Sequence, residues 1–248
     1  MMRAAEAAAL LNGRLSGGDV PFTAVSTDSR HIGRGELFVA LRGERFDGHE
    51  FLGGAASRGA AAAIIDRNYS GAFPLPVVIV DDTKRALGEL ARRWRERFAP
   101  ALIAVTGSNG KTTVKEMVAA ILRRHAGDAS VLATSGNFNN DIGVPLTLLR
   151  LRAEHRWCAI ELGMNHRGEI AYLSKLAAPM PAAWAHAAAA NALRTLCRPG
   201  IASVAAASPS GVRSRRSLER SFIVYPPLTA ALPRPKSTTR RLPARLRK

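Results

Sequence analysis

Cysteine and long apolar runs are both scarce in this chain, and each absence excludes a class of protein. Only two cysteines occur among 248 residues, Cys158 and Cys197. They lie far apart, which fits neither a disulfide framework nor a cysteine metal site. No stretch reaches the roughly 18–20 apolar residues that span a bilayer, and the N-terminus, with Arg3 and then Glu6, lacks the features of a secretory signal. We therefore expect a cytoplasmic protein with no membrane insertion.

Acidic residues are also in short supply. The formal net charge is +17, from 36 Lys and Arg against 19 Asp and Glu. Residues 181–248 hold 13 of the basic residues and one acid, Glu219, so the basicity belongs to this tail rather than to the body. A basic tail can indicate a nucleic-acid-binding protein, which we keep as an alternative of a different class. The tail lacks an RNP signature, zinc-ligand spacing and interleaved aromatic residues, so no nucleic-acid partner is expected.

The composition changes near Pro179. Residues 181–248 hold eight of the 14 prolines but two of the 21 glycines, and no strand–helix pattern continues there. One interpretation is a disordered basic tail. The other is an out-of-frame translation of a GC-rich gene, because Arg, Ala, Pro and Ser dominate the segment. We treat residues 180–248 as an aberrant tail; the coding DNA in its other two frames would separate the interpretations.

The rest of the chain has an α/β pattern. In residues 1–82 we expect a small α/β domain, with helices at 4–11 and 49–58 and strands at 36–41, 61–65 and 77–80. Apolar residues at helical spacing predict a helix over 83–98, and we take 83–99 as the connection to a second domain. Hydrophobic residues make up 47% of the chain, enough for a buried core in both parts.

Residues 100–179 alternate strands with helices. The strands are expected at 102–106, 130–133 and 157–162, and the helices at 111–124 and 168–177. This alternation favours a parallel sheet covered by helices on both faces, whose ligands lie at the carboxyl ends of the strands. The following apolar residues are expected to lie on one face of the helix at 111–124: Val114, Met117, Val118, Ile121 and Leu122.

A phosphate-binding loop is the strongest signal in the sequence. It follows an apolar strand, opens an amphipathic helix and consists of Thr106, Gly107, Ser108, Asn109, Gly110, Lys111, Thr112 and Thr113. The two glycines allow a tight turn whose N–H groups, with the helix N-terminus, attract phosphate. Lys111 places a positive charge near the β- and γ-phosphates, and Thr112 offers a hydroxyl to Mg²⁺. The general motif would need glycine at position 105, where this chain has Val105, so the match is to the shorter T-G-x-x-G-K-T form.

Together with this loop, three other segments resemble the Mur ligase family, and within it the MurF type. The first consists of 26–30 (STDSR), followed by 37–43 (LFVALRG) and 47–49 (DGH). The other two are 136–145 (GNFNNDIGVP) and 161–170 (ELGMNHRGEI). The resemblance runs from about residue 1 to 179. It implies a small N-terminal α/β domain that binds a UDP-linked precursor, followed by an incomplete P-loop-type parallel-sheet domain that binds ATP. A folylpolyglutamate-type ligase shares the loop, but the 26–49 and 161–170 segments argue against it.

The resemblance implies an ATP-dependent amide ligase. In this family type, ATP and Mg²⁺ convert the carboxylate of UDP-N-acetylmuramoyl-tripeptide to an acyl phosphate, and the amine of D-alanyl-D-alanine then attacks it. We expect a monomer. Family members are close to twice as long, and neither their later metal-binding histidine nor their C-terminal domain is recognisable; His186 lies in the right region without matching neighbours. A truncated, non-catalytic product is therefore an alternative.

Five residues are given roles in catalysis, metal binding or precursor binding. Lys111 and Glu161 are the expected catalytic residues, and Thr112 and Glu161 are the expected metal ligands. Glu161 resembles the metal-binding glutamate of the family. The alternative interpretation of Glu161 is a surface acid that follows a strand. Arg30, with Ser29, is suited to a uridine diphosphate, since arginine recognises phosphate well. A solvated turn is the alternative for this pair.

Four further residues are expected to contact substrate. They are Asn137, Asn139, Asn140 and His166. The three asparagines bind ligand or shape a turn, and the sequence does not separate their roles. His166 contacts substrate or caps the following helix, and both interpretations stay open.

Overall fold

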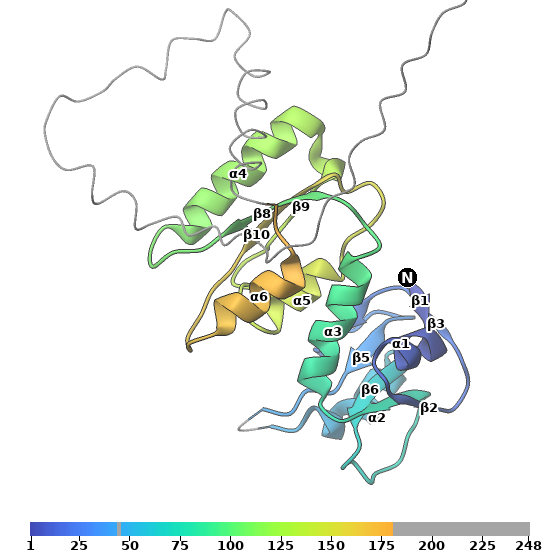
Figure 1. Cartoon of the computed structure of the whole chain (residues 1–248). Coiled ribbons are helices and arrows are strands. Elements are labelled where there is room, and N and C mark those ends of the chain that lie inside the picture. Colours follow the sequence, from blue (N-terminus) through green and yellow to red (C-terminus); the bar gives the residue numbers. More distant parts are fainter. Residues whose placement is uncertain (44–45, 181–248) are drawn as a thin grey trace, which may run out of the picture.

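The structure is a computed structural model that describes residues 1–43 and 46–180. Two α/β units lie one above the other, with the long helix α3 running between them (Figure 1). The predicted aberrant tail and His186 lie outside the described residues, except for Met180. In the described part, no helix is long and apolar enough to cross a membrane.

The N-terminal unit is built on a five-stranded sheet in the order β2-β7-β6-β5-β4. Its strands are β2 (Arg14–Ser16), β4 (Val25–Ser26), β5 (Leu37–Val39), β6 (Ala62–Asp66) and β7 (Val77–Val80). Strands β4 to β7 are parallel, and β2 adds an antiparallel edge. All five residues of β6 are buried, as expected for a parallel strand covered on both faces.

Short elements complete this unit. They are β1 (Met2–Arg3) paired with β3 (Pro21–Phe22), helix α1 (Ala4–Leu10), the 3-10 helix η1 (Gly48–Phe51) and helix α2 (Leu52–Ser57). One face of the sheet packs Phe38, Ile65 and Val77 against Leu52 of α2. The other face belongs to the large core that continues into the central unit.

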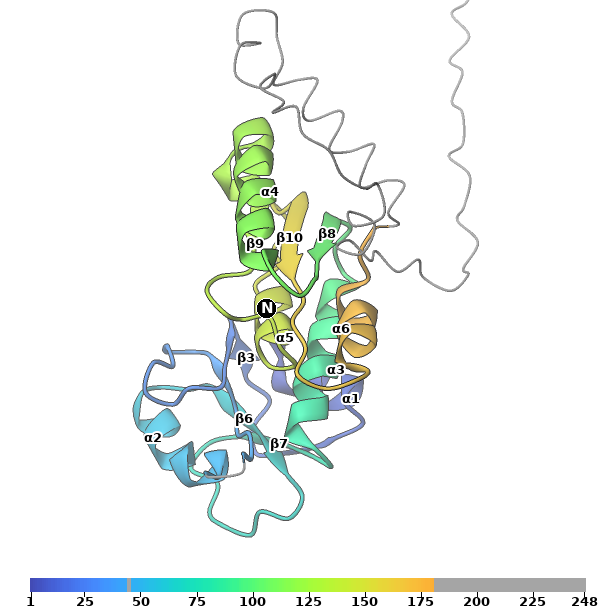
Figure 2. The same ribbon diagram turned by 90° about the vertical axis from the view of Figure 1, so that its left-hand side faces the viewer.

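The central unit has a three-stranded parallel sheet in the order β8-β10-β9. Its strands are β8 (Ala101–Val105), β9 (Val131–Ala133) and β10 (Trp157–Glu161). Helix α4 (Lys111–Ala126) covers one face; on the opposite side lie α3 (Thr83–Arg95), α5 (Gly143–Leu148) and α6 (Glu169–Ala177) (Figures 1 and 2). A short 3-10 helix, η2 (Asp128–Ser130), joins α4 to β9. The predicted parallel sheet with helices on both faces is confirmed.

Helix α3 is more than a connection, because its buried face joins the cores of both units. Leu87, Leu90, Ala91 and Trp94 are buried in one apolar cluster that also holds residues of α1, β7, β8 and β10. The indole N–H of Trp94 donates to the Leu151 carbonyl oxygen at 3.1 Å. The two units therefore share a continuous core.

Most of the apolar face predicted for α4 is not the face that is buried against the sheet. Of the five residues expected there, only Leu122 is buried, while Met117 is 60% exposed and the other three are half-buried. The face turned to the sheet carries Lys115, Ala119 and Leu122, at spacings of four and three residues. Met117 lies on the opposite side of the helix. On the buried face, Ala119 and Leu122 pack against Val131, Ala133 and Ala159 of the sheet.

Candidate functional site

The predicted phosphate loop joins the end of β8 to the start of α4. Parallel pairing aligns Val105 of β8 with Glu161 of β10, and Leu162 N–H donates to the Val105 carbonyl at 2.9 Å. The loop therefore leaves the sheet beside Glu161, at the carboxyl edge where ligands are expected. Gly110 has φ 71°, a left-handed conformation that glycine adopts without strain, and it directly precedes the helix.

The N-terminus of α4 is open to an anion. No side chain caps it, and its first turn holds no acidic residue. Helix α3 differs, because the Asp82 carboxylate accepts from Lys84 N–H at 2.8 Å and Arg85 N–H at 2.9 Å. Free N–H groups and the helix dipole favour phosphate at such a terminus. Lys111 and Thr106–Gly107 are half-buried, and the following loop residues are exposed: Ser108, Asn109, Gly110, Thr112 and Thr113.

Glu161 is the most unusual acid of the structure. It is 1% exposed, which contradicts the interpretation as a surface acid. Its Oε1 accepts from Asn139 Nδ2 at 2.8 Å, while Oε2 is buried without a hydrogen-bond partner among the described residues. A buried, unsatisfied carboxylate oxygen destabilises a fold unless a cation completes it.

The donor set at this edge fits Mg²⁺. Among the described residues, no group of three or more His, Cys, Asp or Glu is placed to hold a metal by itself. Mg²⁺ does not need one, since it is commonly bound by one or two protein oxygens together with substrate phosphates and water. Glu161 and the Thr112 hydroxyl are ligands of this kind.

The three asparagines of the 137–140 segment differ in their contacts. Asn139 holds Glu161 through its side chain, and its carbonyl accepts from Gly163 N–H at 2.7 Å. Asn140 Oδ1 accepts from Ile142 N–H at 3.2 Å and Gly143 N–H at 2.8 Å, so it shapes the turn into α5. Asn137 is exposed. The structure thus brings Asn139 alone into contact with the predicted metal ligand.

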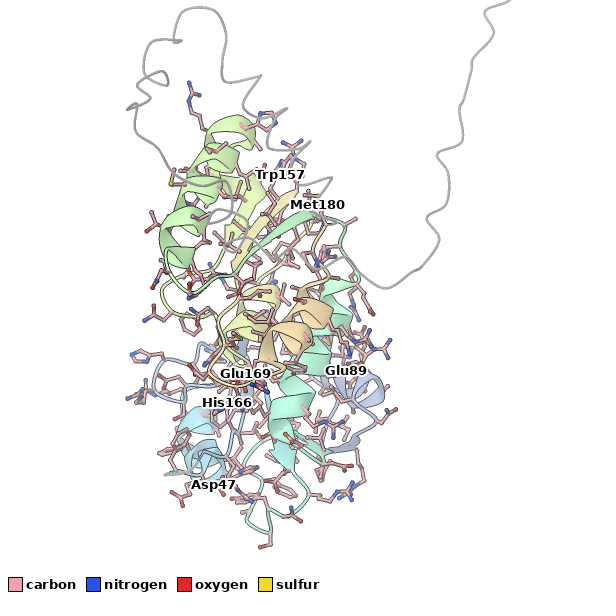
Figure 3. All side chains as sticks on the ribbon, turned by 60° about the vertical axis from the view of Figure 1, so that its left-hand side comes forward. Asp47, Glu89, Trp157, His166, Glu169 and Met180 are labelled. Atoms are coloured by element: carbon pink, nitrogen blue, oxygen red, sulfur yellow. The ribbon has the colours of Figure 1, made fainter. Side chains whose placement is uncertain are left out.

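The loop from β10 to α6 carries His166, whose side chain is exposed. No side chain caps α6; the Glu169 carboxylate instead binds the preceding loop, where its Oε2 accepts from Asn165 N–H at 2.7 Å and His166 N–H at 3.1 Å. Figure 3 shows His166 and Glu169 together at this loop. These two backbone hydrogen bonds, from Asn165 first and then His166, lower the pKa of the Glu169 carboxyl. Glu169, which the sequence interpretation passed over, is the residue that holds the loop.

In the N-terminal unit, Arg30 is paired within its own turn. Its guanidinium donates to both carboxylate oxygens of Asp28, at 3.0 and 2.9 Å, and its side chain is 79% exposed. Hydrogen bonds from Arg30 and then His31 hold the pKa of Asp28 well below its usual range. Ser29 is half-buried beside this pair.

A cavity of about 210 Å³ lies between the two units at this point. One wall is formed by Ser26, Thr27 and Asp28, and the other comes from the segment 135–150 of the central unit. The predicted precursor-binding segment, residues 26–30, therefore faces the loop between β9 and α5 (residues 134–142, called the asparagine loop below). Ser29 and Arg30 do not line the cavity itself.

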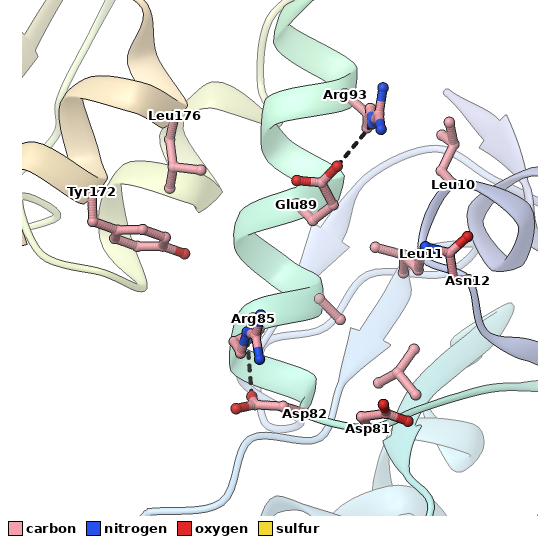
Figure 4. Close-up of a pocket in the computed structure, with 12 residues that line it drawn as sticks. Leu10, Leu11, Asn12, Asp81, Asp82, Arg85, Glu89, Arg93, Tyr172 and Leu176 are labelled. Atoms are coloured by element: carbon pink, nitrogen blue, oxygen red, sulfur yellow. Dashed lines mark hydrogen bonds and ion pairs between the residues drawn. The ribbon is translucent and has the colours of Figure 1, made fainter.

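A larger cavity, of about 430 Å³, contains none of the predicted site residues. It lies between α1, the end of β7, α3 and α6 (Figure 4). Its charged side chains include Glu89, whose carboxylate accepts from Arg93 at 2.8 Å. The cavity brings together none of the residues that carry the sequence motifs, and we assign no site to it.

Both units match known protein families. Residues 21–95 match the catalytic domain of the Mur ligase family, and residues 105–190 match the Mur ligase middle domain. The chain belongs to the Mur ligase family. The middle-domain match continues past residue 179, where the change in composition begins.

Individual relatives are of the MurF type. The UDP-N-acetylmuramoyl-tripeptide–D-alanyl-D-alanine ligase of Haemophilus influenzae is 50% identical over 174 residues, which cover 69% of this chain and 38% of the relative. A crystal structure of MurF from Acinetobacter baumannii superposes with a TM-score of 0.65 at 41% identity, covering 72% of this chain and 39% of that one. The structure of MurF from Thermotoga maritima in complex with ADP superposes with a TM-score of 0.55 at 34% identity. The match covers 63% of this chain and 35% of that one. The chain thus spans about two fifths of the length of the relatives that it matches.

Proposed function

We propose that this chain carries the precursor-binding and nucleotide-binding parts of an ATP-dependent amide ligase. The reaction joins D-alanyl-D-alanine to UDP-N-acetylmuramoyl-tripeptide in the cytoplasm. The observation that carries the proposal is the pairing of an uncapped phosphate-loop helix with a buried, half-satisfied carboxylate at the same sheet edge. The similarity to MurF ligases, at 50% identity over 174 residues for the Haemophilus influenzae enzyme, supports the substrates.

In this proposal, the two domains bind different substrates. Residues 1–82 bind the UDP-linked precursor, and residues 100–179 bind ATP, with 83–99 between them. Lys111 and the N–H groups of the loop neutralise the β- and γ-phosphates, while Thr112 and Glu161 hold Mg²⁺. When bound, the metal ion supplies charge neutralisation on the phosphoryl group that is transferred.

The chemistry has two steps. A carboxylate oxygen of the tripeptide attacks the γ-phosphorus, the bond to the β-phosphate oxygen breaks, and an acyl phosphate and ADP result. The amine of D-alanyl-D-alanine then attacks the acyl carbon, inorganic phosphate leaves, and the nitrogen loses a proton to give the amide. The chain's own residues contribute position and charge: Lys111 stabilises negative charge at the phosphates, and the loop orients them.

The precursor would extend from the N-terminal unit to this edge. The cavity between residues 26–28 and 135–150 lies on that path. Arg30 binds the diphosphate by exchanging Asp28 for phosphate oxygens, with Ser29 beside it. The residues that contact the precursor near the metal are Asn137, Asn139 and His166, and Asn140 acts through the turn that it holds.

Nucleotide binding by the full chain tests the proposal. At a concentration 100 times the Kd, Mg²⁺·ADP stabilises a folded protein by about 2.7 kcal/mol, which should raise the Tm by about 5–10 °C in a folded part of this size. Lys111→Ala should weaken ADP binding by about 10- to 100-fold, since a hydrogen bond to a charged group contributes about 1.5–3 kcal/mol. Arg124→Ala, at the exposed far end of α4, is the matched control. A Tm unmoved by both ADP and the UDP-linked precursor would overturn the proposal.

A further inference from the structure

Lys115 has no role in the mechanism above, yet it is among the most buried side chains of the protein. It lies one turn after Lys111 on α4 and is 0% exposed. A buried ammonium group is costly, because taking a charge out of water carries a large desolvation penalty. A lysine at this position therefore calls for an explanation beyond packing.

The ammonium group has one buried partner. Its Nζ donates to the carbonyl oxygen of Thr134 at 2.8 Å and also contacts the Glu116 carboxylate. Glu116 has 55% of its side chain exposed, so that contact lies at the surface. The inward contact fixes the backbone where β9 ends and the asparagine loop begins.

Thr134 connects this contact to Glu161. Its N–H donates to the Ala159 carbonyl at 3.0 Å, and its hydroxyl accepts from Glu161 N–H at 3.0 Å. Further along the same segment, Asn139 binds the Glu161 carboxylate and accepts from Gly163 N–H. The segment 134–139 is thus bonded to α4 on one side and to β10 on the other.

We propose that Lys115 is a positioning residue for the metal ligand Glu161. By tying residue 134 to the phosphate-loop helix, it sets the asparagine loop so that Asn139 engages one carboxylate oxygen of Glu161 and leaves the other free for the divalent cation that accompanies the nucleotide. This inference rests on the proposed nucleotide site.

The first test compares ADP affinity with and without Mg²⁺. Calorimetric titrations in EDTA and in excess Mg²⁺ give the metal-dependent gain in ADP affinity. Lys115→Met should leave the affinity in EDTA unchanged and reduce the gain about 10-fold or more, since loss of an outer-shell partner of a metal ligand typically costs 10–100-fold. Glu161→Gln should remove the gain. Lys175→Met, the same change at an exposed position on α6, should behave as wild type.

The second test needs no ligand and guards against a simple loss of folding. In Lys115→Met, amide hydrogen exchange should speed up in residues 134–140 and stay unchanged in β6 and β7 of the N-terminal unit. Glu116→Gln should leave exchange in 134–140 as in wild type, because the surface contact does not hold the loop. If Glu116→Gln loosens the loop as much as Lys115→Met, the assignment to the Thr134 carbonyl is wrong.

The outcomes separate this inference from the proposed function. A wild-type chain without any Mg²⁺-dependent gain refutes the nucleotide site, and the positioning role falls with it. If the wild type shows the gain and Glu161→Gln abolishes it, but Lys115→Met matches wild type, only the inference is overturned. Faster exchange throughout both units in Lys115→Met would assign it a general structural role and likewise overturn the inference.

Discussion

The two units treat their candidate ligand-binding groups in opposite ways. In the N-terminal unit these groups satisfy one another: Asp28 accepts from Arg30 and His31, and its turn closes on itself. In the central unit the start of α4 has no capping side chain, and one oxygen of Glu161 has no partner among the described residues. An unmet polar group inside an otherwise satisfied fold marks where a ligand completes the structure, whereas a closed turn must exchange partners before it binds.

The polar groups around buried His49, also in the N-terminal unit, are likewise paired with one another. Its Nε2 accepts from Asp66 N–H at 3.0 Å, so its Nδ1 carries the proton and donates to the Asp47 carboxylate. Arg42 then bridges Asp47 and Asp66. With every member paired, this cluster orders the loop around residue 48 and leaves no group free for a ligand, which is the reverse of the arrangement at Glu161.

The largest expected effect on stability tests how tightly the asparagine loop is packed. In Gly143→Ala, the new Cβ would lie 2.3 Å from the Cα of Phe138 and 2.5 Å from its carbonyl carbon, so backbone must move. The free energy of unfolding in urea should fall by about 1–3 kcal/mol, the usual cost of overpacking. Gly53→Ala in α2 is the matched control, since its Cβ meets nothing within 4 Å. The free energy of unfolding of Gly53→Ala should rise by about 0.5–1 kcal/mol, because alanine has the higher helix propensity. Equal losses of stability in both variants would show that the asparagine loop is not packed more tightly than α2.

A smaller effect on stability, of opposite sign, is expected at Glu161, whose carboxylate has one oxygen without a hydrogen-bond partner among the described residues. Glu161→Gln removes a buried charge, so the ligand-free protein should become more stable by about 1 kcal/mol, raising the Tm by about 2–4 °C. Glu169→Gln is the comparison, because that carboxylate is satisfied by two N–H donors and its replacement should lower the Tm. A lower ligand-free Tm for Glu161→Gln would show that this carboxylate is satisfied after all.

The smallest effect concerns the closed turn of Asp28. Its pKa lies below the ordinary value of 3.8 through hydrogen bonds from Arg30 and His31, so the stability it contributes is present above pH 3.8 and is lost as the pH falls below that value. Because the pair is solvent-exposed, Asp28→Asn should cost less than about 1 kcal/mol at pH 7. The difference from wild type, measured by urea unfolding, should shrink between pH 4 and pH 2. Asp128→Asn, at an exposed acid of η2, should show no such trend.

Much of the fold could be predicted from local pattern. The strand at 77–80 and the start of the helix at residue 111 agree with the structure, since period and loop chemistry are local properties. Helix α5 was missed because it is short and its Gly143 and Pro145 are typical of a turn. Strands β1 to β4 were missed because two or three residues show no period; only their pairing partners define them.

The site could be predicted in part, because some of its residues belong to short sequence motifs. The phosphate loop, Lys111 and Glu161 follow from short-range sequence, yet three asparagines within four residues look alike until the fold separates them. Only Asn139 contacts Glu161, whereas Asn140 shapes a turn. Lys115 was passed over because a lysine within a helix normally lies at the surface; its spacing to Ala119 and Leu122 was the available signal.

The sequence by itself determined the longer strands and helices and where a glycine-rich turn meets a helix N-terminus, because these depend on dihedral preferences and on neighbours a few residues away. The tertiary structure alone decided that Glu161 is buried with one free oxygen, that Lys115 reaches the Thr134 carbonyl, and that α3 joins two cores. Those features depend on contacts between residues 19 or more positions apart, which only chain packing brings together.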